Sequence, residues 1–115
     1  MNVERVRELC LSHAYVEECT PFGEDNLVFK VGGKIFAMLS LDIDHRLNLK
    51  CAPERAIELR ERYPDTIMPG YHMNKRHWNS VYVDMLEEEN VEEQILHAYD
   101  LVYKALPQKI KEGMK

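Results

Sequence analysis

A glycine pair separates two strand-like runs in Leu27-Val28-Phe29-Lys30-Val31-Gly32-Gly33-Lys34-Ile35-Phe36-Ala37-Met38-Leu39-Ser40-Leu41. Apolar residues alternate with more exposed positions before the pair, and residues 35–41 after it are nearly all apolar, so we predict two strands. Gly32 and Gly33 can take the positive φ angles of a two-residue hairpin turn. The unbroken apolar run predicts that the second strand is central in its sheet and covered on both faces.

The chain before this hairpin is predicted to form a helix and a further strand. Asn2 is a suitable N-cap, and apolar residues follow it at helical spacing to predict a helix that ends near His13. Residues 15–20 can be extended, whereas residues 21–26 have the composition of a loop.

The chain after the hairpin is predicted to form a connection over residues 41–45 and then a half-buried strand. Residues 46–51 alternate strictly, with Leu47, Leu49 and Cys51 on one face and Arg46, Asn48 and Lys50 on the other. Because the polar side of this strand is basic, we expect that face of the sheet to meet solvent or a partner.

Proline residues delimit the elements that follow. Pro53 suits the first turn of a helix, and that helix is predicted to stop before Pro64. Residues 65–68 can be extended, and Pro69-Gly70 has the two residues that a type II turn favours at its centre. Residues 77–83 are rich in β-branched and aromatic side chains, which predicts a further strand.

A last helix is predicted from a capping-box-like start at Asn90 and Glu93 up to Pro107, and the Lys-rich end beyond it is expected to fray. The apolar positions at helical spacing are Ile95, Tyr99, Val102 and Leu106. Strands joined by short turns, together with amphipathic helices, predict a single α+β domain over residues 1–115. Its antiparallel sheet would carry helices packed on one face.

The composition is that of a globular protein, and 115 residues suffice for one domain with its own core. No apolar run approaches the length of a membrane span, and the N-terminus lacks the basic-then-apolar pattern of a signal peptide. Cys10, Cys19 and Cys51 form no CxxC pair, which suits a reduced protein. We therefore expect a cytoplasmic protein that is not associated with a membrane.

Charge is distributed unevenly along the chain, whose net charge is −5. Residues 1–44 and residues 80–115 each carry four basic and eight acidic side chains. Residues 45–79 carry seven basic and four acidic side chains and three of the five histidines. Such a block can face an anion, although a helix with interspersed Glu and Arg is more often a solvated surface.

A second stretch has the polar, aromatic and basic composition of a recognition surface, namely Pro69-Gly70-Tyr71-His72-Met73-Asn74-Lys75-Arg76-His77-Trp78-Asn79-Ser80-Val81. It resembles the signature segment of the MmcQ/YjbR family of small bacterial proteins, and the upstream Lys50-Cys51-Ala52-Pro53-Glu54-Arg55-Ala56 is also similar to that family. The resemblance covers essentially the whole chain. It implies a helix-flanked antiparallel sheet like that of frataxin (CyaY-like) proteins and a "double-wing" DNA-binding function.

The DNA-binding hypothesis selects basic side chains at two predicted hairpin tips and on the strand over residues 46–51. They are Lys30, Lys34, Arg46, Lys50, Lys75 and Arg76. Lys and Arg bind phosphates, and Arg and Asn can also read base edges. The acidic pI of about 5.5 argues against this hypothesis, because nucleic-acid-binding domains usually carry a basic surface. Any DNA binding is therefore expected to be weak or non-specific.

The alternative hypothesis is a small-ligand or protein-binding pocket around Tyr71, His72 and Trp78. Its candidate residues are Tyr71, His72, Asn74, His77, Trp78 and Asn79. Trp78 would have to lie on an open face to stack on a ligand, whereas a lone strand tryptophan is most often a core anchor. The two asparagines are also suited to satisfying turn backbone.

We expect no catalytic activity, no bound metal and no cofactor. The sequence has no Gly-x-Ser-x-Gly elbow and no phosphate-binding glycine loop, and nothing in it would activate Ser80. His72 and His77 match no zinc-ligand spacing with Cys51. Acid–base chemistry by either histidine, and iron binding by exposed carboxylates, are weaker alternatives.

Overall fold

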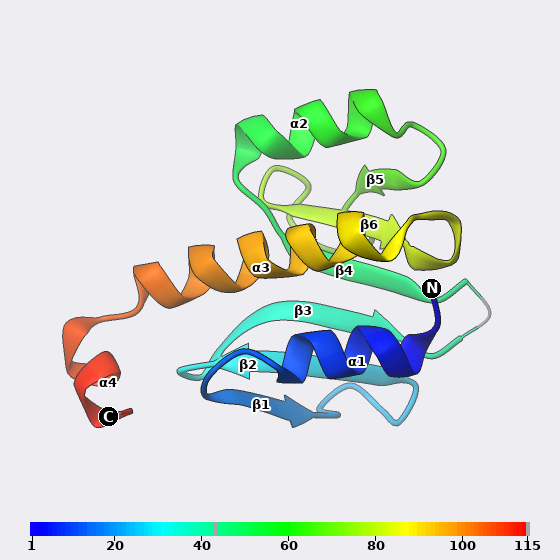
Figure 1. Cartoon of the computed structure of the whole chain (residues 1–115). Coiled ribbons are helices and arrows are strands. Elements are labelled where there is room, and N and C mark those ends of the chain that lie inside the picture. Colours follow the sequence, from blue (N-terminus) through cyan, green and yellow to red (C-terminus); the bar gives the residue numbers. More distant parts are fainter. Residues whose placement is uncertain (43, 115) are drawn as a thin grey trace.

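The structure, a computed structural model, describes residues 1–42 and 44–114 (Figure 1). Its strands are β1 (Val16–Cys19), β2 (Asn26–Val31), β3 (Lys34–Ser40), β4 (Arg46–Lys50), β5 (Ile67–Pro69) and β6 (Trp78–Tyr82). Its helices are α1 (Val3–Leu11), α2 (Pro53–Arg62), α3 (Glu88–Ala105) and α4 (Gln108–Gly113), and a 3-10 turn η1 spans Val83–Met85. Ile43, inside the predicted connection over residues 41–45, lies outside the described residues. No helix within the described residues is long and apolar enough to cross a membrane.

The strands form one six-stranded sheet in the order β1-β2-β3-β4-β6-β5, and every neighbouring pair is antiparallel. Helices α1 and α3 pack against each other and against this sheet, and α2 packs against β5 and β6 at its end (Figure 1). The predicted α+β architecture, an antiparallel sheet with helices on one face, is confirmed.

The hairpin between β2 and β3 turns at Gly32 and Gly33, whose φ angles are 58° and 80°. Both angles lie in the left-handed region that a two-residue turn of this kind requires, so this prediction is confirmed. Lys30 pairs with Ile35 and Phe29 pairs with Ala37, so Phe36 is an extra residue that forms a β-bulge. Strand β3 is central in the sheet, also as predicted.

The core lies between the helices and the sheet face that carries Leu47 and Leu49 of β4. Its largest fully buried side chains include Phe29, Phe36, Leu39, Leu47, Leu49, Ile67 and Ile95. Asn2 caps α1 as predicted, because its side chain accepts a hydrogen bond from the backbone N–H of Arg5 at 2.8 Å.

The opposite face of the sheet, here called the open face, carries no packed helix from residues 1–42 and 44–114. Side chains alternate along a strand, so Arg46, Asn48 and Lys50 point away from the core that holds Leu47 and Leu49. The prediction that β3 is covered on both faces is wrong, because Ile35 and Met38 are only half-buried and line a cavity instead. The apolar residues of this central strand therefore contribute both to the core and to the wall of a cavity.

The predicted type II turn at Pro69-Gly70 is also wrong. Positive φ angles among the described glycines occur at Gly23, Gly32 and Gly33, but not at Gly70. Pro69 belongs to β5, and the N–H of Gly70 donates to the carbonyl of Trp78 at 2.9 Å. A Cβ on Gly70 would lie 2.7 Å from the Cβ of Trp78, so glycine permits close approach here.

The start of the last predicted helix and the segment after it differ in the structure, whereas the helix does end before Pro107 as predicted. Helix α3 begins at Glu88, because the carbonyl of Glu87 accepts hydrogen bonds from the N–H groups of Asn90 and Val91; Asn90 is therefore not its cap. The chain beyond Pro107 forms α4 instead of fraying. Ile110 of α4 and the preceding Leu106 pack closely over Gly32, so this terminus has a docking place on the hairpin.

Candidate functional site

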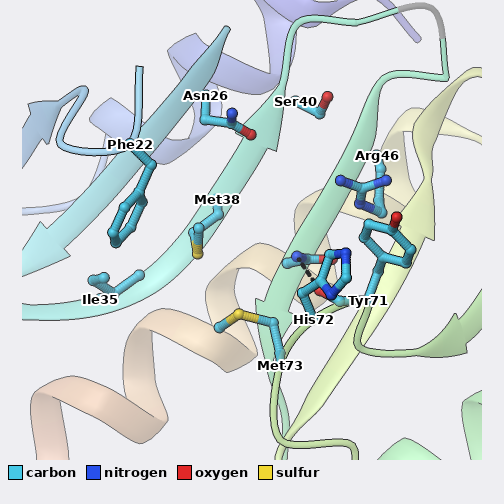
Figure 2. A pocket seen from close by; sticks show the side chains of 10 residues that line it. Phe22, Asn26, Ile35, Met38, Ser40, Arg46, Tyr71, His72 and Met73 are labelled. Carbon is cyan, nitrogen blue, oxygen red and sulfur yellow. Dashed lines mark hydrogen bonds between the residues drawn. The ribbon is translucent and has the colours of Figure 1, made fainter. Parts of the chain in front are cut away.

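The open face holds a cavity of about 420 Å³ at the centre of the sheet (Figure 2). It is lined by strands β2, β3 and β4, by Phe22 from the loop before β2, and by the segment that connects β5 to β6. The lining residues are Phe22, Asn26, Ile35, Met38, Ser40, Arg46, Asn48, Tyr71, His72 and Met73. No described helix occupies this side of the sheet. The volume of the cavity is within the range of small-molecule sites.

Two buried polar side chains fix the connecting segment above the sheet. Asn48 and Ser80 are cross-strand partners on β4 and β6, and the Ser80 hydroxyl donates to Asn48 Oδ1 at 2.5 Å. The backbone N–H of Tyr71 donates to Ser80 Oγ at 2.8 Å, and Asn48 Nδ2 donates to the carbonyl of Tyr71 at 3.4 Å. Both backbone groups of Tyr71 are therefore held by side chains of the sheet.

His72 follows in a conformation that side-chain-bearing residues rarely adopt, with a φ angle of 56°. Its ring lies beside that of Tyr71, with 4.0 Å between centroids, and both rings face the cavity (Figure 2). Unusual backbone conformations of this kind persist where the surroundings impose them, and they concentrate at binding sites.

Arg46 supplies the cationic wall of the cavity. Its guanidinium lies over the Tyr71 ring, 4.2 Å from the centroid, and its Nη1 donates to Asp44 Oδ2 at 3.3 Å. The Arg46 side chain is only 18% exposed, and its buried Nε has no hydrogen-bond partner within residues 1–42 and 44–114. A buried donor without a partner is unusual, because such groups are nearly always satisfied.

The remaining wall of the cavity is apolar. Ile35 and Met38 project from β3, Met73 comes from the connecting segment, and Phe22 borders the cavity with 61% of its surface exposed (Figure 2). Methionine side chains adapt readily to irregular ligand shapes. The cavity thus combines an apolar part with one arginine beside an aromatic ring.

The far side of the connecting segment is tied to α2 by Arg60. Its Nε donates to Asn79 Oδ1 at 2.7 Å, and its Nη2 donates to the carbonyls of Trp78, at 3.2 Å, and Lys75. Asn79 Nδ2 in turn donates to the carbonyl of Ala56 at 3.4 Å. Sequence reasoning treated the charges of this helix as a solvated surface and missed this role, which no sequence spacing reveals.

Comparison with known proteins identifies the family of this chain, because the YjbR family model matches residues 11–101. The chain belongs to the YjbR family. It is 40% identical over 115 residues to "Uncharacterized protein YbdF" of Escherichia coli O157:H7, a match that covers 97% of this chain and 93% of the relative. It is 30% identical over 86 residues to "Uncharacterized protein YjbR" of Escherichia coli K12, covering 73% of this chain and 71% of that one.

A solved structure has the same fold. The crystal structure of Deinococcus radiodurans protein DR2400, family-model domain DUF419, superposes with a TM-score of 0.90 at 35% sequence identity. The superposition covers 98% of this chain and 87% of the other. The resemblance drawn from the signature segment is therefore confirmed at the level of family and fold.

The structure divides the six predicted pocket residues of this YjbR-family chain. Tyr71 and His72 line the open-face cavity, whereas Asn74, His77, Trp78 and Asn79 do not. Asn74 Oδ1 accepts from the N–H of Arg76 at 2.9 Å, and the carbonyl of His77 accepts from the N–H of Cys51 at 2.9 Å. Trp78 is 8% exposed and borders a different cavity from the one that Tyr71 and His72 line.

The six predicted DNA-binding residues lie in separate settings. Arg46 faces the open-face cavity, and Lys75 Nζ donates to the carbonyl of Gly70 at 3.1 Å. Lys34 and Lys50 border the cavity that Trp78 also lines. Lys30 is half-buried in β2, and Arg76 is exposed in the connecting segment.

Several residues of the cavity were missed by sequence reasoning, above all Phe22, Met38, Asn48 and Met73. The alternation of residues 46–51 does place Asn48 on the face of Arg46, and that signal was available. The contribution of Phe22 depends on how its loop folds over the sheet, which no local pattern gives.

Three features of the described residues concern nucleophiles and metal ligands. The Ser80 hydroxyl is buried and donates to the amide oxygen of Asn48, which is not a base. Residues 1–42 and 44–114 contain no group of three or more His, Cys, Asp or Glu side chains arranged to hold a metal ion. Burial raises the pKa of the Cys51 thiol, so this cysteine is a poor thiolate nucleophile.

Proposed function

We propose that this YjbR-family protein binds, without chemical conversion, a small molecule that has an apolar body and a carboxylate or other oxyanion group. The ligand would occupy the open-face cavity. Arg46 carries the proposal, because its guanidinium lies at the cavity wall on the Tyr71 ring and its buried Nε has no partner among the described residues.

The state of Arg46 favours a ligand with an oxygen acceptor. Among the described residues the Arg46 guanidinium donates through Nη1 alone, to Asp44, which leaves its other terminal nitrogen for a ligand oxygen, and a hydrogen bond to a charged group contributes about 1.5–3 kcal/mol. Guanidinium and carboxylate form the strongest of the ordinary side-chain hydrogen bonds. Since Nη1 of Arg46 already donates to Asp44, recognition would depend on the direction of the remaining N–H groups more than on net charge.

The apolar wall favours a ligand with a hydrophobic body of modest size. Ile35, Met38 and Met73 would contact it, and the exposed Phe22 would cover it from the loop before β2. The Asn48–Ser80 pair already holds Tyr71 in place, so binding would not have to order this segment. Preorganisation of this kind reduces the entropic cost of binding.

The test uses 4-phenylbutyrate as the probe and 4-phenyl-1-butanol as its uncharged counterpart, with 15N-labelled protein observed by NMR. We expect amide shifts at residues 46–48 and 71–73 with the carboxylate. Loss of a charged hydrogen bond by Arg46→Gln should weaken its binding by about 10-fold or more. Arg62→Gln is the matched control, because it removes an exposed positive charge from α2 outside this cavity.

Two results would contradict the proposal. The first is equal binding of the alcohol and the carboxylate, because Arg46 would then contribute nothing. The second is a set of shifts that maps to the helix-covered side of the sheet.

DNA binding is the second candidate. Lys34, Lys50 and Arg76 favour it, because the charged groups of these side chains form no ion pair with the described part of the chain. Arg46 and Lys75 favour it less, since each is bound internally. The net charge of −5 would oppose approach to a polyanion, so any complex would be weak and non-specific.

Fluorescence anisotropy with duplex DNA at low and moderate salt separates the two candidates. Each phosphate contact should contribute a slope of about −0.9 to log affinity against log salt. Lys50→Ala/Arg76→Ala should therefore reduce the magnitude of the slope by about two. A folded sample that does not bind DNA at low salt would exclude this candidate and leave the small-ligand proposal standing.

A further inference from the structure

A second cavity, of about 490 Å³, opens where β3 and β4 diverge. The two strands pair only from Ala37 to Leu39 against Leu49 to Leu47, so the ends that carry Lys34 and Lys50 are splayed apart. The C-terminal half of α3 closes this opening. The lining residues are Gly33, Lys34, Ile35, Lys50, Trp78, Leu101, Val102, Ala105, Leu106 and Pro107.

This cavity is distinct from the site around Arg46 and Tyr71, because the two linings share Ile35 alone. Its walls are almost entirely apolar, with Leu101, Val102 and Leu106 from the end of α3 on one side. Trp78 lies on the other side, and its 8% exposure shows that only a small part of the ring is open. An apolar molecule in this open cavity would therefore contact aliphatic side chains and the edge of one indole.

The charged residues that line this cavity are both lysines. Lys34 is exposed at the start of β3, and Lys50 is half-buried at the end of β4. Lys50 Nζ lies 5.5 Å from the centroid of the Trp78 ring, which is within the range of a cation–π contact. Neither lysine forms an ion pair with residues in the described part of the chain, and the lining contains no carboxylate.

We propose that this cavity binds a free amphipathic anion, such as a medium-chain carboxylate. Its apolar part would pack against α3 and Trp78, and its head group would lie between Lys34 and Lys50. The charge complementarity is local, because the protein as a whole carries a net charge of −5 and would repel an anion. A preference for the anion over its neutral analogue would therefore come from these two lysines.

Trp78 makes the test specific to this site, because it is the single tryptophan of the chain and lines the cavity. Octanoate and 1-octanol are titrated at pH 7 while tryptophan fluorescence is followed. We expect octanoate to produce a saturable change at lower concentration than octanol. Lys34→Gln and Lys50→Gln should each weaken octanoate binding by about 3- to 5-fold, as expected for partly exposed charge pairs, and leave octanol binding unchanged.

Arg62→Gln is again the control, because it removes one positive charge outside this cavity and should leave both titrations unchanged. Lys34 is exposed and Lys50 is only half-buried, so both glutamine variants should fold, which thermal melts would verify. The proposal is overturned if octanol binds as tightly as octanoate, or if the double variant Lys34→Gln/Lys50→Gln retains full octanoate affinity. It is also overturned if tryptophan fluorescence does not change up to the solubility limit of octanoate.

Discussion

The two faces of the sheet differ although the same strands build both. On β4, Leu47 and Leu49 are buried beneath the helices, whereas Arg46 and Asn48, which alternate with them, face the cavity on the other side. The first face is filled by side chains from α1 and α3, and the second is left open to solvent or a ligand. Residues that stabilise the core and residues that face the cavity thus alternate along one strand. We expect substitutions on the first face to lower stability more than substitutions on the second.

The largest effect on stability is expected at Trp78, a residue that does not follow this division between the two faces. This residue is in register with Lys50 and therefore points away from the core, yet it is almost fully buried. Trp78→Ala should lower the free energy of unfolding by about 3–5 kcal/mol, as for a core aromatic residue. Urea denaturation followed by circular dichroism measures this loss, since fluorescence is lost with the tryptophan.

Tyr71→Ala is the comparison for Trp78→Ala, because Tyr71 is 50% exposed on the same side of the sheet. It should change the free energy of unfolding by about 1 kcal/mol or less. Equal losses for the two variants would show that Trp78 is not an anchor of the fold.

The next effect sharpens the difference between the faces by comparing two apolar truncations. Leu47→Ala removes a fully buried side chain and should cost about 2–5 kcal/mol of unfolding free energy. Met38→Ala removes a half-buried side chain from the cavity wall and should cost less than half as much. The same urea measurements decide the matter, and a larger loss for Met38→Ala would mean that the open face carries the core.

A smaller effect is expected from the polar pair beneath Tyr71. Ser80→Ala leaves the backbone N–H of Tyr71 without its acceptor and should cost about 1–3 kcal/mol. The amide resonances of residues 71–73 should shift and broaden in 15N NMR spectra, because the segment loses one of its two attachments to the sheet. Unchanged resonances in this variant would show that the Ser80 hydroxyl does not position the segment.

The smallest effect concerns pH and lies on the helix-covered face. The imidazole Nε2 of His97 accepts a hydrogen bond from the N–H of Ala52 at 3.2 Å. Burial, aided by Arg55, lowers the pKa of His97, although Asp100 and Glu93 oppose this shift. The unfolded chain therefore binds a proton more readily, and stability should fall as pH decreases below about 6.5.

Urea denaturation at pH 7.5 and pH 5.5 measures this dependence. His97→Gln offers an amide oxygen to Ala52 without a titrating group and should reduce the difference between the two pH values. Some dependence should remain, because burial also lowers the pKa of His13, which stacks on Tyr99. An unchanged difference in the variant would assign the effect to other groups.

Local patterns predicted most elements of the fold because each depends on near neighbours. The positive φ angles at Gly32 and Gly33 and the N-cap at Asn2 involve residues within a few positions. Alternation along β4 likewise placed its basic and apolar sides correctly. These features need only backbone preferences and the period of a strand.

The predictions that failed involve contacts between distant parts of the chain. Gly70 is required by its approach to Trp78 and not by a turn, and the last helical segment is ordered by packing on Gly32. Arg60 reaches the carbonyl of Lys75, 15 positions away, and nothing in its own helix indicates this. The candidate cavity was therefore only partly predicted, because Phe22 and Met38 join it through tertiary folding.

The short pairing between β3 and β4 has a mechanical consequence. Three residue pairs join these strands, whereas β2 pairs with β3 over six and β4 pairs with β6 over five. Strand β5 is joined to β6 over three pairs as well, but at the edge of the sheet. Inside the sheet, the line between β3 and β4 has the shortest pairing; it divides β1-β2-β3 from β4-β6-β5, and α3 bridges the two halves through its contacts with β3 and β4. Each cavity is lined by residues from both halves of the sheet. A molecule bound in either cavity would therefore contact both halves and resist twisting of one half relative to the other.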